Sequence, residues 1–151
     1  MSEYGFQGMP PFNAFKQFIP ENELNLTSPS VKNHQKHSVG YETIEAYMER
    51  EYRIPEKFED YIYVSQLLQA KGMQIAIEAH RRNRPYCMGT LFWQLNDCWP
   101  VTSWSTIDYY FNRKASYYTV KKAYADVLIS VIEEKGNLST WLINDKLAPV
   151  D

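Results

Sequence analysis

The sequence has no long apolar run, only two cysteines, and almost no net charge. Its apolar runs fall well short of the roughly 18 residues that a membrane-spanning helix needs. Residues 1–11 have neither a basic start nor an apolar stretch of signal-peptide length. The formal charge of -2 produces no broad field that would attract nucleic acid or an anionic membrane. We therefore expect neither nucleic acid nor membrane as a partner.

Candidate metal ligands are also scarce. Cys87 and Cys98 are too few for a disulfide framework and lack the paired spacing of a zinc site. We interpret both as small, buried or half-buried residues. His34 and His37 lie in a loop rich in serine and asparagine, with no evident third ligand. No metal and no cofactor are expected.

Aromatic residues are the one compositional excess, at 15% of the chain, and they are concentrated between Tyr86 and Tyr118. Aromatic faces suit either a large core or a platform on which sugar rings stack. The chain has 151 residues, which is enough for one domain with a core. It is well short of the roughly 250 residues of a complete (β/α)₈ barrel. A single domain or part of one is therefore expected.

The pattern of apolar residues and turn formers predicts the order of elements. Residues 2–12 are expected to be the end of an extended segment that opens into a loop, and 13–40 to be loop-like with at most one short helical turn. Helices are predicted at 41–52, 56–81 and 115–126. The continuously apolar run 86–93 predicts a strand buried on both faces. Two short strands, 127–132 and 138–145, are expected around a turn.

The helix predicted at 56–81 has two features of its own. Ser65 and Gly72 are small members of its apolar stripe, so another element is expected to pack closely there. The basic residues Arg81, Arg82 and Arg84 follow at its end. They could contact phosphate, but cations at this position also oppose the helix dipole, and we favour this structural role.

Two groups of residues could carry chemistry. Glu3 closes an extended segment, where a carboxylate could attack the anomeric carbon of a sugar; a glutamate near a chain start is more often simply solvated. Trp93 ends the predicted strand and is followed by Asn96 and Asp97, which places an aromatic face beside polar groups as sugar binding requires. The alternative is that the tryptophans pack in a core while Asn96 and Asp97 cap turns.

Four segments in this order resemble the β-mannosidases of glycoside hydrolase family two: residues 2–7, 78–85, 89–104 and 107–110. The similarity runs from Glu3 to about Val127. It implies an α/β fold in which residues 1–126 form the C-terminal portion of a TIM (β/α)₈ barrel, covering strands 7 and 8 and their helices. Residues 127–151 would be the truncated start of a β-sandwich domain.

The resemblance also implies the roles of site residues. Glu3 matches the catalytic nucleophile at the end of the seventh barrel strand, and Trp93 matches an active-site tryptophan at the end of the eighth. Asn96 and Asp97 would contact the substrate, a mannose-containing oligosaccharide. The mechanism would be retaining and would release terminal β-D-mannosyl residues.

The second carboxyl group of such a mechanism has no match in the sequence. In the family, the acid/base glutamate follows an asparagine upstream of the nucleophile, and here only Met1 and Ser2 precede Glu3. Asn22-Glu23 has the right residues but follows the nucleophile, so the role is not assigned to it. We therefore expect a fragment that is inactive alone, with exposed strand edges that favour oligomerisation or marginal stability.

An alternative function, from a different class of protein, stays open. The chain could be a non-catalytic module that binds carbohydrate or protein through the aromatic cluster around Trp93. Binding of mannose that is lost in Trp93→Ala, without any turnover, would favour this alternative.

Overall fold

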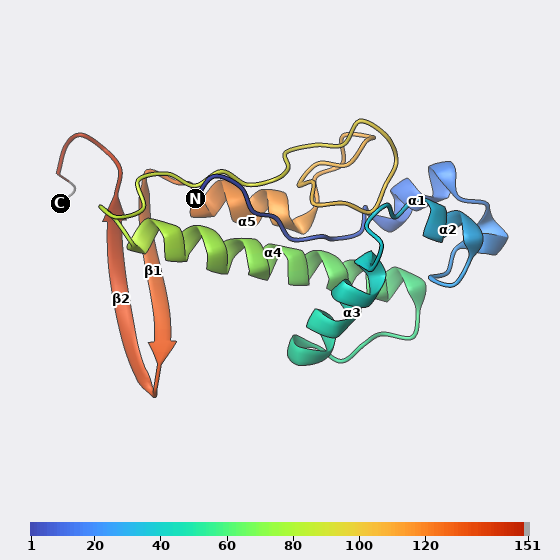
Figure 1. Cartoon of the computed structure of the whole chain (residues 1–151), viewed down its shortest axis with the longest axis horizontal. Coiled ribbons are helices and arrows are strands. Elements are labelled where there is room, and N and C mark those ends of the chain that lie inside the picture. Colours follow the sequence, from blue (N-terminus) through green and yellow to red (C-terminus); the bar gives the residue numbers. More distant parts are fainter. Residues whose placement is uncertain (150–151) are drawn as a thin grey trace.

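The computed structural model describes residues 1–149 and consists of helices and one small sheet (Figure 1). In chain order the elements are α1 (Phe12–Phe18), the 3₁₀ helix η1 (Glu21–Glu23), α2 (Pro29–Asn33), α3 (Gly40–Glu51), α4 (Phe58–Arg82), α5 (Ala115–Ala123), β1 (Val127–Glu134) and β2 (Asn137–Asn144). The long helix α4 forms the axis, and α5 packs along it. The predicted helices 41–52, 56–81 and 115–126 are confirmed, with shifted ends.

Helix α4 begins shortly after Pro55, and the charged residues at its two ends interact favourably with the helix dipole. Glu59 and Asp60 occupy its first turn, and its last turn is basic. Its small residues allow close packing, as expected. A Cβ atom added at Gly72 would lie 2.6 Å from the ring of Phe6. The Ser65 hydroxyl accepts a 3.2 Å hydrogen bond from the backbone N–H of Met9. The N-terminal segment therefore lies directly on α4.

Residues 13–40 contain more helix than the sequence predicts. Three short helical elements, α1, η1 and α2, occupy this region. Helix α2 starts at Pro29, and the Ser28 side chain accepts a hydrogen bond from the backbone N–H of Val31. The sequence does not predict α2, because the segment around this cap and proline is otherwise rich in turn-forming residues.

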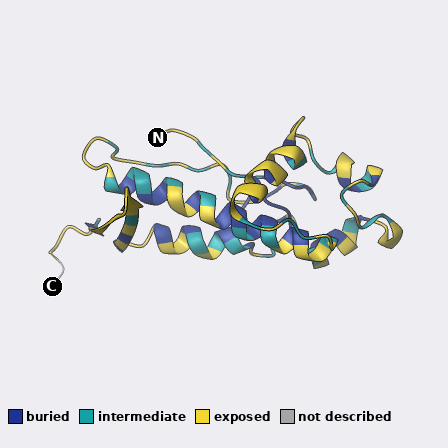
Figure 2. Ribbon diagram, turned by 90° about the horizontal axis from the view of Figure 1, so that it is seen from below, coloured by how far each residue is buried: buried dark blue, intermediate teal, exposed yellow. Residues whose placement is uncertain are grey.

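The prediction of a buried strand at 86–93 is wrong. The segment is not a regular strand, although its backbone runs beside the N-terminal segment. The backbone N–H of Leu91 donates to the carbonyl oxygen of Met1 at 3.2 Å. The backbone N–H of Trp93 donates to the carbonyl oxygen of Tyr4 at 2.7 Å. Leu91 and Trp93 are 66% and 51% exposed. Within residues 1–149 the helices cover one face of this extended pair, which explains why the apolar run is not buried on both faces (Figure 2).

The β1–β2 hairpin confirms the two predicted strands. The strands are antiparallel, with Val127 opposite Asn144 and Glu134 opposite Asn137. Lys135 and Gly136 form the connection, with φ angles of 54° and 78°. A two-residue turn with two positive φ angles matches the right-handed twist of the strands. β1 begins at Val127, where the sequence predicts a new domain; the last two residues of the predicted 127–151 unit lie outside the described residues.

Candidate functional site

Glu3 and Trp93 share one face of the extended pair. Side chains alternate between faces along an extended segment. Tyr4 and Phe6 pack against the cluster of Met73, Ile77, Val120 and Ala123 between α4 and α5, and Phe92 packs there too. Their neighbours Glu3 and Trp93 therefore face away from the helices, and both are exposed. The structure brings these two predicted site residues onto adjacent segments with a common orientation.

A cavity of about 360 Å³ lies beside Trp93. We call it the aromatic cleft. Trp93, Trp99 and Trp104 line it, together with Asp97 and Cys98. Its remaining lining residues are Gln35, Lys36, His37, Gln94, Val101, Thr102 and Ser103. Glu3 is not among the described residues that line this cleft. Cys98 is exposed there, so the expectation that it is at least half-buried is wrong.

The loop before α3 supplies residues that the sequence did not single out as site residues. The His37 ring meets Trp104 edge-to-face, with 5.9 Å between ring centroids. The Lys36 ammonium lies 5.5 Å from the centroid of the Trp99 ring. His34 stacks on Trp99, and its Nδ1 lies 2.6 Å from the carbonyl oxygen of Pro100. His34 and His37 thus pack against different tryptophans.

Asp97 and Asn96 differ in their surroundings. Asp97 is buried, and its two carboxylate oxygens accept hydrogen bonds from Ser103 and Ser105 at 2.7 and 2.6 Å. Burial raises the pKa of Asp97, and the two serine hydroxyls oppose that rise. The carboxylate is thus engaged in fixing its own loop. Asn96 is exposed and forms a backbone bridge with Ile107. Direct contact of either residue with a substrate stays a prediction.

A buried lysine joins the N-terminal segment to the loop of the aromatic cleft. Lys114 is fully buried, and its Nζ donates to the carbonyl oxygen of Gly8 at 2.8 Å and to that of Ser103 at 3.4 Å. The N–H of Gly8 also donates to Ser103 at 2.9 Å. Burial lowers the pKa of Lys114 to about 7, while Asp97 and Asp108 act in the opposite direction. Lys114 therefore fixes two segments that are distant in the sequence.

Gln69 makes a second connection of this kind from α4. Its amide nitrogen donates to the carbonyl oxygens of Phe6, Trp104 and Ser105, at 2.9, 3.2 and 3.1 Å. Its amide oxygen accepts from Ser116 of α5. One side chain thus links the N-terminal segment, the cleft loop and both helices, and buried polar groups with all partners satisfied specify a rigid arrangement.

Gly5 marks the point of closest approach between the two extended segments. A Cβ atom at this position would lie 2.3 Å from the carbonyl oxygen of Trp93 and 2.8 Å from the Trp104 ring. No L-side chain fits against a backbone oxygen at that distance. The glycine two residues after Glu3 thus allows the segment that carries Glu3 to lie against the backbone of Trp93.

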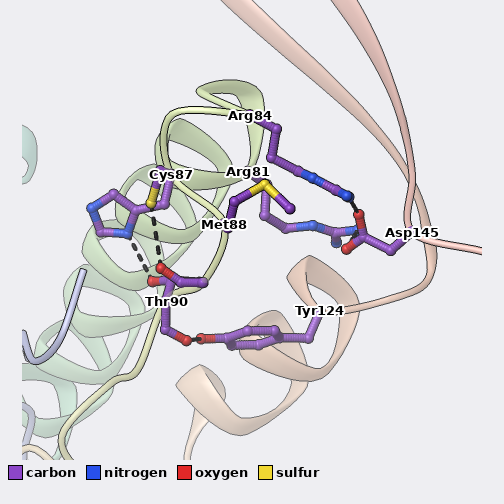
Figure 3. Close-up of a pocket in the computed structure, with 9 residues that line it drawn as sticks. Arg81, Arg84, Cys87, Met88, Thr90, Tyr124 and Asp145 are labelled. Atoms are coloured by element: carbon purple, nitrogen blue, oxygen red, sulfur yellow. Dashed lines mark hydrogen bonds and ion pairs between the residues drawn. The ribbon is translucent and has the colours of Figure 1, made fainter.

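Arg81 in the last turn of α4 and Arg84 just after it bind Asp145 at the end of the hairpin, as Figure 3 shows. Arg81 donates to the carbonyl oxygens of Ala123 and Ala125 and to the Asp145 carboxylate, and Arg84 also pairs with Asp145. Arg81, Arg84 and Asp145 line a cavity of about 240 Å³. Both arginines are engaged within the molecule, which agrees with the structural role expected for the basic run.

Residues 1–149 contain no group of three or more histidine, cysteine, aspartate or glutamate side chains that could hold a metal ion. In the same residues, no helix combines the length and apolar character needed to span a membrane.

Comparison with solved structures defines the class of fold. The chain matches a β-D-mannosidase from Dictyoglomus thermophilum with a TM-score of 0.93 and 38% identity, over 97% of this chain and 18% of that one. It matches the exo-chitosanase CsxA of Amycolatopsis orientalis with a TM-score of 0.74 and 21% identity, over 91% and 17% of the two chains. The second likeness is one of fold alone. The fold is thus that of one segment of these larger enzymes.

Sequence comparison narrows the relationship. No protein-family model matches the chain. It is 35% identical to β-mannosidase B of Thermothelomyces thermophilus over 141 residues, 87% of this chain and 16% of the relative. The β-mannosidase B of Aspergillus niger is 31% identical over 91% of this chain and 17% of the relative. The chain is therefore homologous to one segment of the β-mannosidases, which confirms the resemblance, and it spans about a sixth of their length.

Proposed function

We propose that this chain supplies the nucleophile and one wall of the active site of a retaining β-mannosidase. Glu3 attacks the anomeric carbon of a terminal β-D-mannosyl residue, and a covalent glycosyl-enzyme forms. The residues of the chain form the C-terminal portion of a TIM barrel, and the extended pair corresponds to its seventh and eighth strands. Residues 127–151 begin a following β-sandwich domain.

The observation that carries this proposal is the common orientation of Glu3 and Trp93. Both side chains leave adjacent extended segments on the face opposite α4 and α5. In a barrel whose helices form the outer ring, that face is the interior. In this proposal the tryptophan offers its ring to the apolar face of a pyranose, and the carboxylate of Glu3 approaches the reacting carbon from the same face.

The mechanism requires a second carboxyl group about 5 Å from the first. It protonates the leaving oxygen and then activates water. Glu23 is not given this role, because its carboxylate accepts a hydrogen bond from the backbone N–H of Ser30 at 3.1 Å. We propose that a segment outside residues 1–151 supplies the second carboxyl group. The chain alone is therefore expected to show no turnover. The substrate would be a mannose-containing oligosaccharide.

Covalent labelling tests the assignment. In the complete protein that carries this chain, a slow 2-fluoro-mannoside should label Glu3, and peptide mass spectrometry identifies the labelled residue. Glu3→Gln should lower kcat for β-mannosides by at least about 1,000-fold, since the covalent route is lost. Label on another carboxylate, or full activity of Glu3→Gln, would refute the role of Glu3.

Glu23→Gln serves as the matched control. It makes the same chemical change at the glutamate of the Asn22-Glu23 pair. The carboxylate of Glu23 accepts a hydrogen bond from the backbone of α2. Its kcat is expected to stay within about 2-fold of the original, because a surface substitution of this kind has a small effect.

A comparison of mannoside, galactoside and glucuronide hydrolysis then establishes which sugar the complete protein prefers.

A further inference from the structure

Phe111 combines an unusual backbone with unusual exposure. Its φ angle is 63°, in the left-handed region that bulky L-residues rarely adopt. Its side chain is 83% exposed. Burial of the ring within residues 1–149 therefore does not compensate for the backbone conformation. Such a combination points to a role for the ring on the surface.

The turn that presents Phe111 is firmly held. The Asp108 carboxylate is buried and accepts hydrogen bonds from the backbone and the side-chain nitrogen of Asn112, at 2.8 and 2.9 Å. The N–H of Phe111 donates to the carbonyl oxygen of Asp108 at 3.0 Å. Next to it, Tyr110 stacks on Phe18 of α1 with 6.2 Å between ring centroids. The ring is thus presented by a rigid turn.

A cavity of about 540 Å³ lies at this turn, beside the aromatic cleft. Tyr109 and Phe111 provide rings, Gln17 and Asn112 provide amides, and Asp97 and Tyr110 complete the lining. Asp97 also lines the aromatic cleft, so the two cavities are neighbours. Rings with exposed faces beside amide groups are suited to a pyranose, which needs both an apolar surface and hydrogen-bond partners.

We propose that Phe111 and Tyr109 form a stacking platform for the leaving-group sugar of an oligosaccharide substrate. This inference rests on the proposed function. An enzyme that releases terminal residues holds one ring in its reaction site, so the rest of the substrate lies on the leaving-group side. The mannosyl ring lies against Trp93 within reach of Glu3, and the cavity at Phe111 holds the sugar to which that ring is linked.

The test compares substrates with and without that second sugar in the complete protein. Phe111→Gly removes the ring and suits the positive φ angle. It should lower kcat/KM for β-1,4-mannotriose by about 5-fold, the value of one lost stacking contact. With methyl β-mannoside the change should stay within about 2-fold. Thermal stability should rise by a few degrees, because the strained conformation is relieved. Equal loss with both substrates, or with neither, would overturn the platform.

Two further variants separate the ring from folding effects. Phe111→Asn also tolerates positive φ and lacks the ring, so it should behave as Phe111→Gly does. Tyr63→Ala removes an exposed ring from α4, 63% accessible and outside both cavities, and should leave both substrates unaffected. If Tyr63→Ala lowers mannotriose turnover as Phe111→Gly does, the effect belongs to aromatic surface in general and the platform is refuted.

A binding measurement keeps this inference distinct from the proposed function. Calorimetric titration of mannotriose is carried out in the Glu3→Gln background, with and without Phe111→Gly. A roughly 5-fold weaker Kd supports the platform even if the protein hydrolyses no β-mannoside, an outcome that would reject only the catalytic proposal. Equal affinities, or no binding at all, would overturn the platform.

Discussion

The Nζ atom of Lys114 lies 2.8 Å from the carbonyl oxygen of Gly8, although the two residues are 106 positions apart. Gly8 follows Glu3 on the same extended segment, and Lys114 directly precedes α5. Because Lys114 also contacts the carbonyl oxygen of Ser103, one fully buried lysine side chain ties the segment of the proposed nucleophile to the loop of the aromatic cleft.

Lys114→Met should therefore loosen the connection between these segments. The buried carbonyl of Gly8 would lose its donor, which costs about 1 to 3 kcal/mol. Amide hydrogen exchange in peptides covering Gly8 and Ser103 should accelerate by about 5- to 150-fold in the complete protein. Lys122→Met, an exposed lysine of α5, is the control and should leave these peptides unchanged. Unchanged exchange in Lys114→Met would show that the contact does not hold the segments.

The lowered pKa of Lys114 predicts a pH dependence. The folded-state pKa is about 7, against about 10.5 for an unfolded lysine. Between these values the unfolded chain binds more protons, so stability should rise as the pH increases from 7 to 9.5. Above pH 10 buried tyrosines act in the opposite direction, as burial raises the pKa of Tyr41 to about 12.

Protection of the Gly8 amide, corrected for the intrinsic exchange rate at each pH, measures this effect. In the original protein the protection should increase from pH 7 to 9.5, and in Lys114→Met the increase should be absent. A rise of equal size in both proteins would assign the effect to other groups.

Gly5 gives a direct test of the proposed geometry. In Gly5→Ala the new methyl group would meet the carbonyl oxygen of Trp93, so one of the two extended segments must move. A displacement of about 1 Å at a reacting group can cost on the order of 100-fold in rate. Gly89→Ala is the matched control, since a Cβ atom there meets nothing within 4 Å. Equal kcat/KM values for the two variants would argue against close registration of Glu3 with Trp93.

The helices could be predicted from the sequence because their signals are local. The apolar period and Pro55 indicate α4, and the same period indicates α3 and α5. The prediction that the run 86–93 is buried on both faces is wrong because a continuous apolar sequence indicates burial without identifying what covers each face. Here the helices cover Phe92, while Leu91 and Trp93 are exposed.

The candidate site was predictable only in part. Glu3 and Trp93 stood out by residue type and by resemblance, and Asp97 by its place after a tryptophan. Lys114 follows an arginine and looks like an ordinary surface lysine in the sequence. Its role, like that of Gln69, depends on pairing between segments far apart in the chain, which a local pattern does not encode.

A comparison of two half-exposed tryptophans distinguishes an effect at the proposed site from a general effect of removing a surface ring. Trp93 is 51% exposed at the aromatic cleft, and Trp141 is 47% exposed on the hairpin. Trp93→Ala removes the ring proposed to stack on the mannosyl residue, so kcat/KM for a simple β-mannoside should fall by about 10-fold or more. Trp141→Ala makes the same change in volume and exposure away from the cleft, and its kcat/KM should stay within about 2-fold. If Trp93→Ala binds and hydrolyses β-mannosides as well as Trp141→Ala does, the face shared by Glu3 and Trp93 is not the site of reaction.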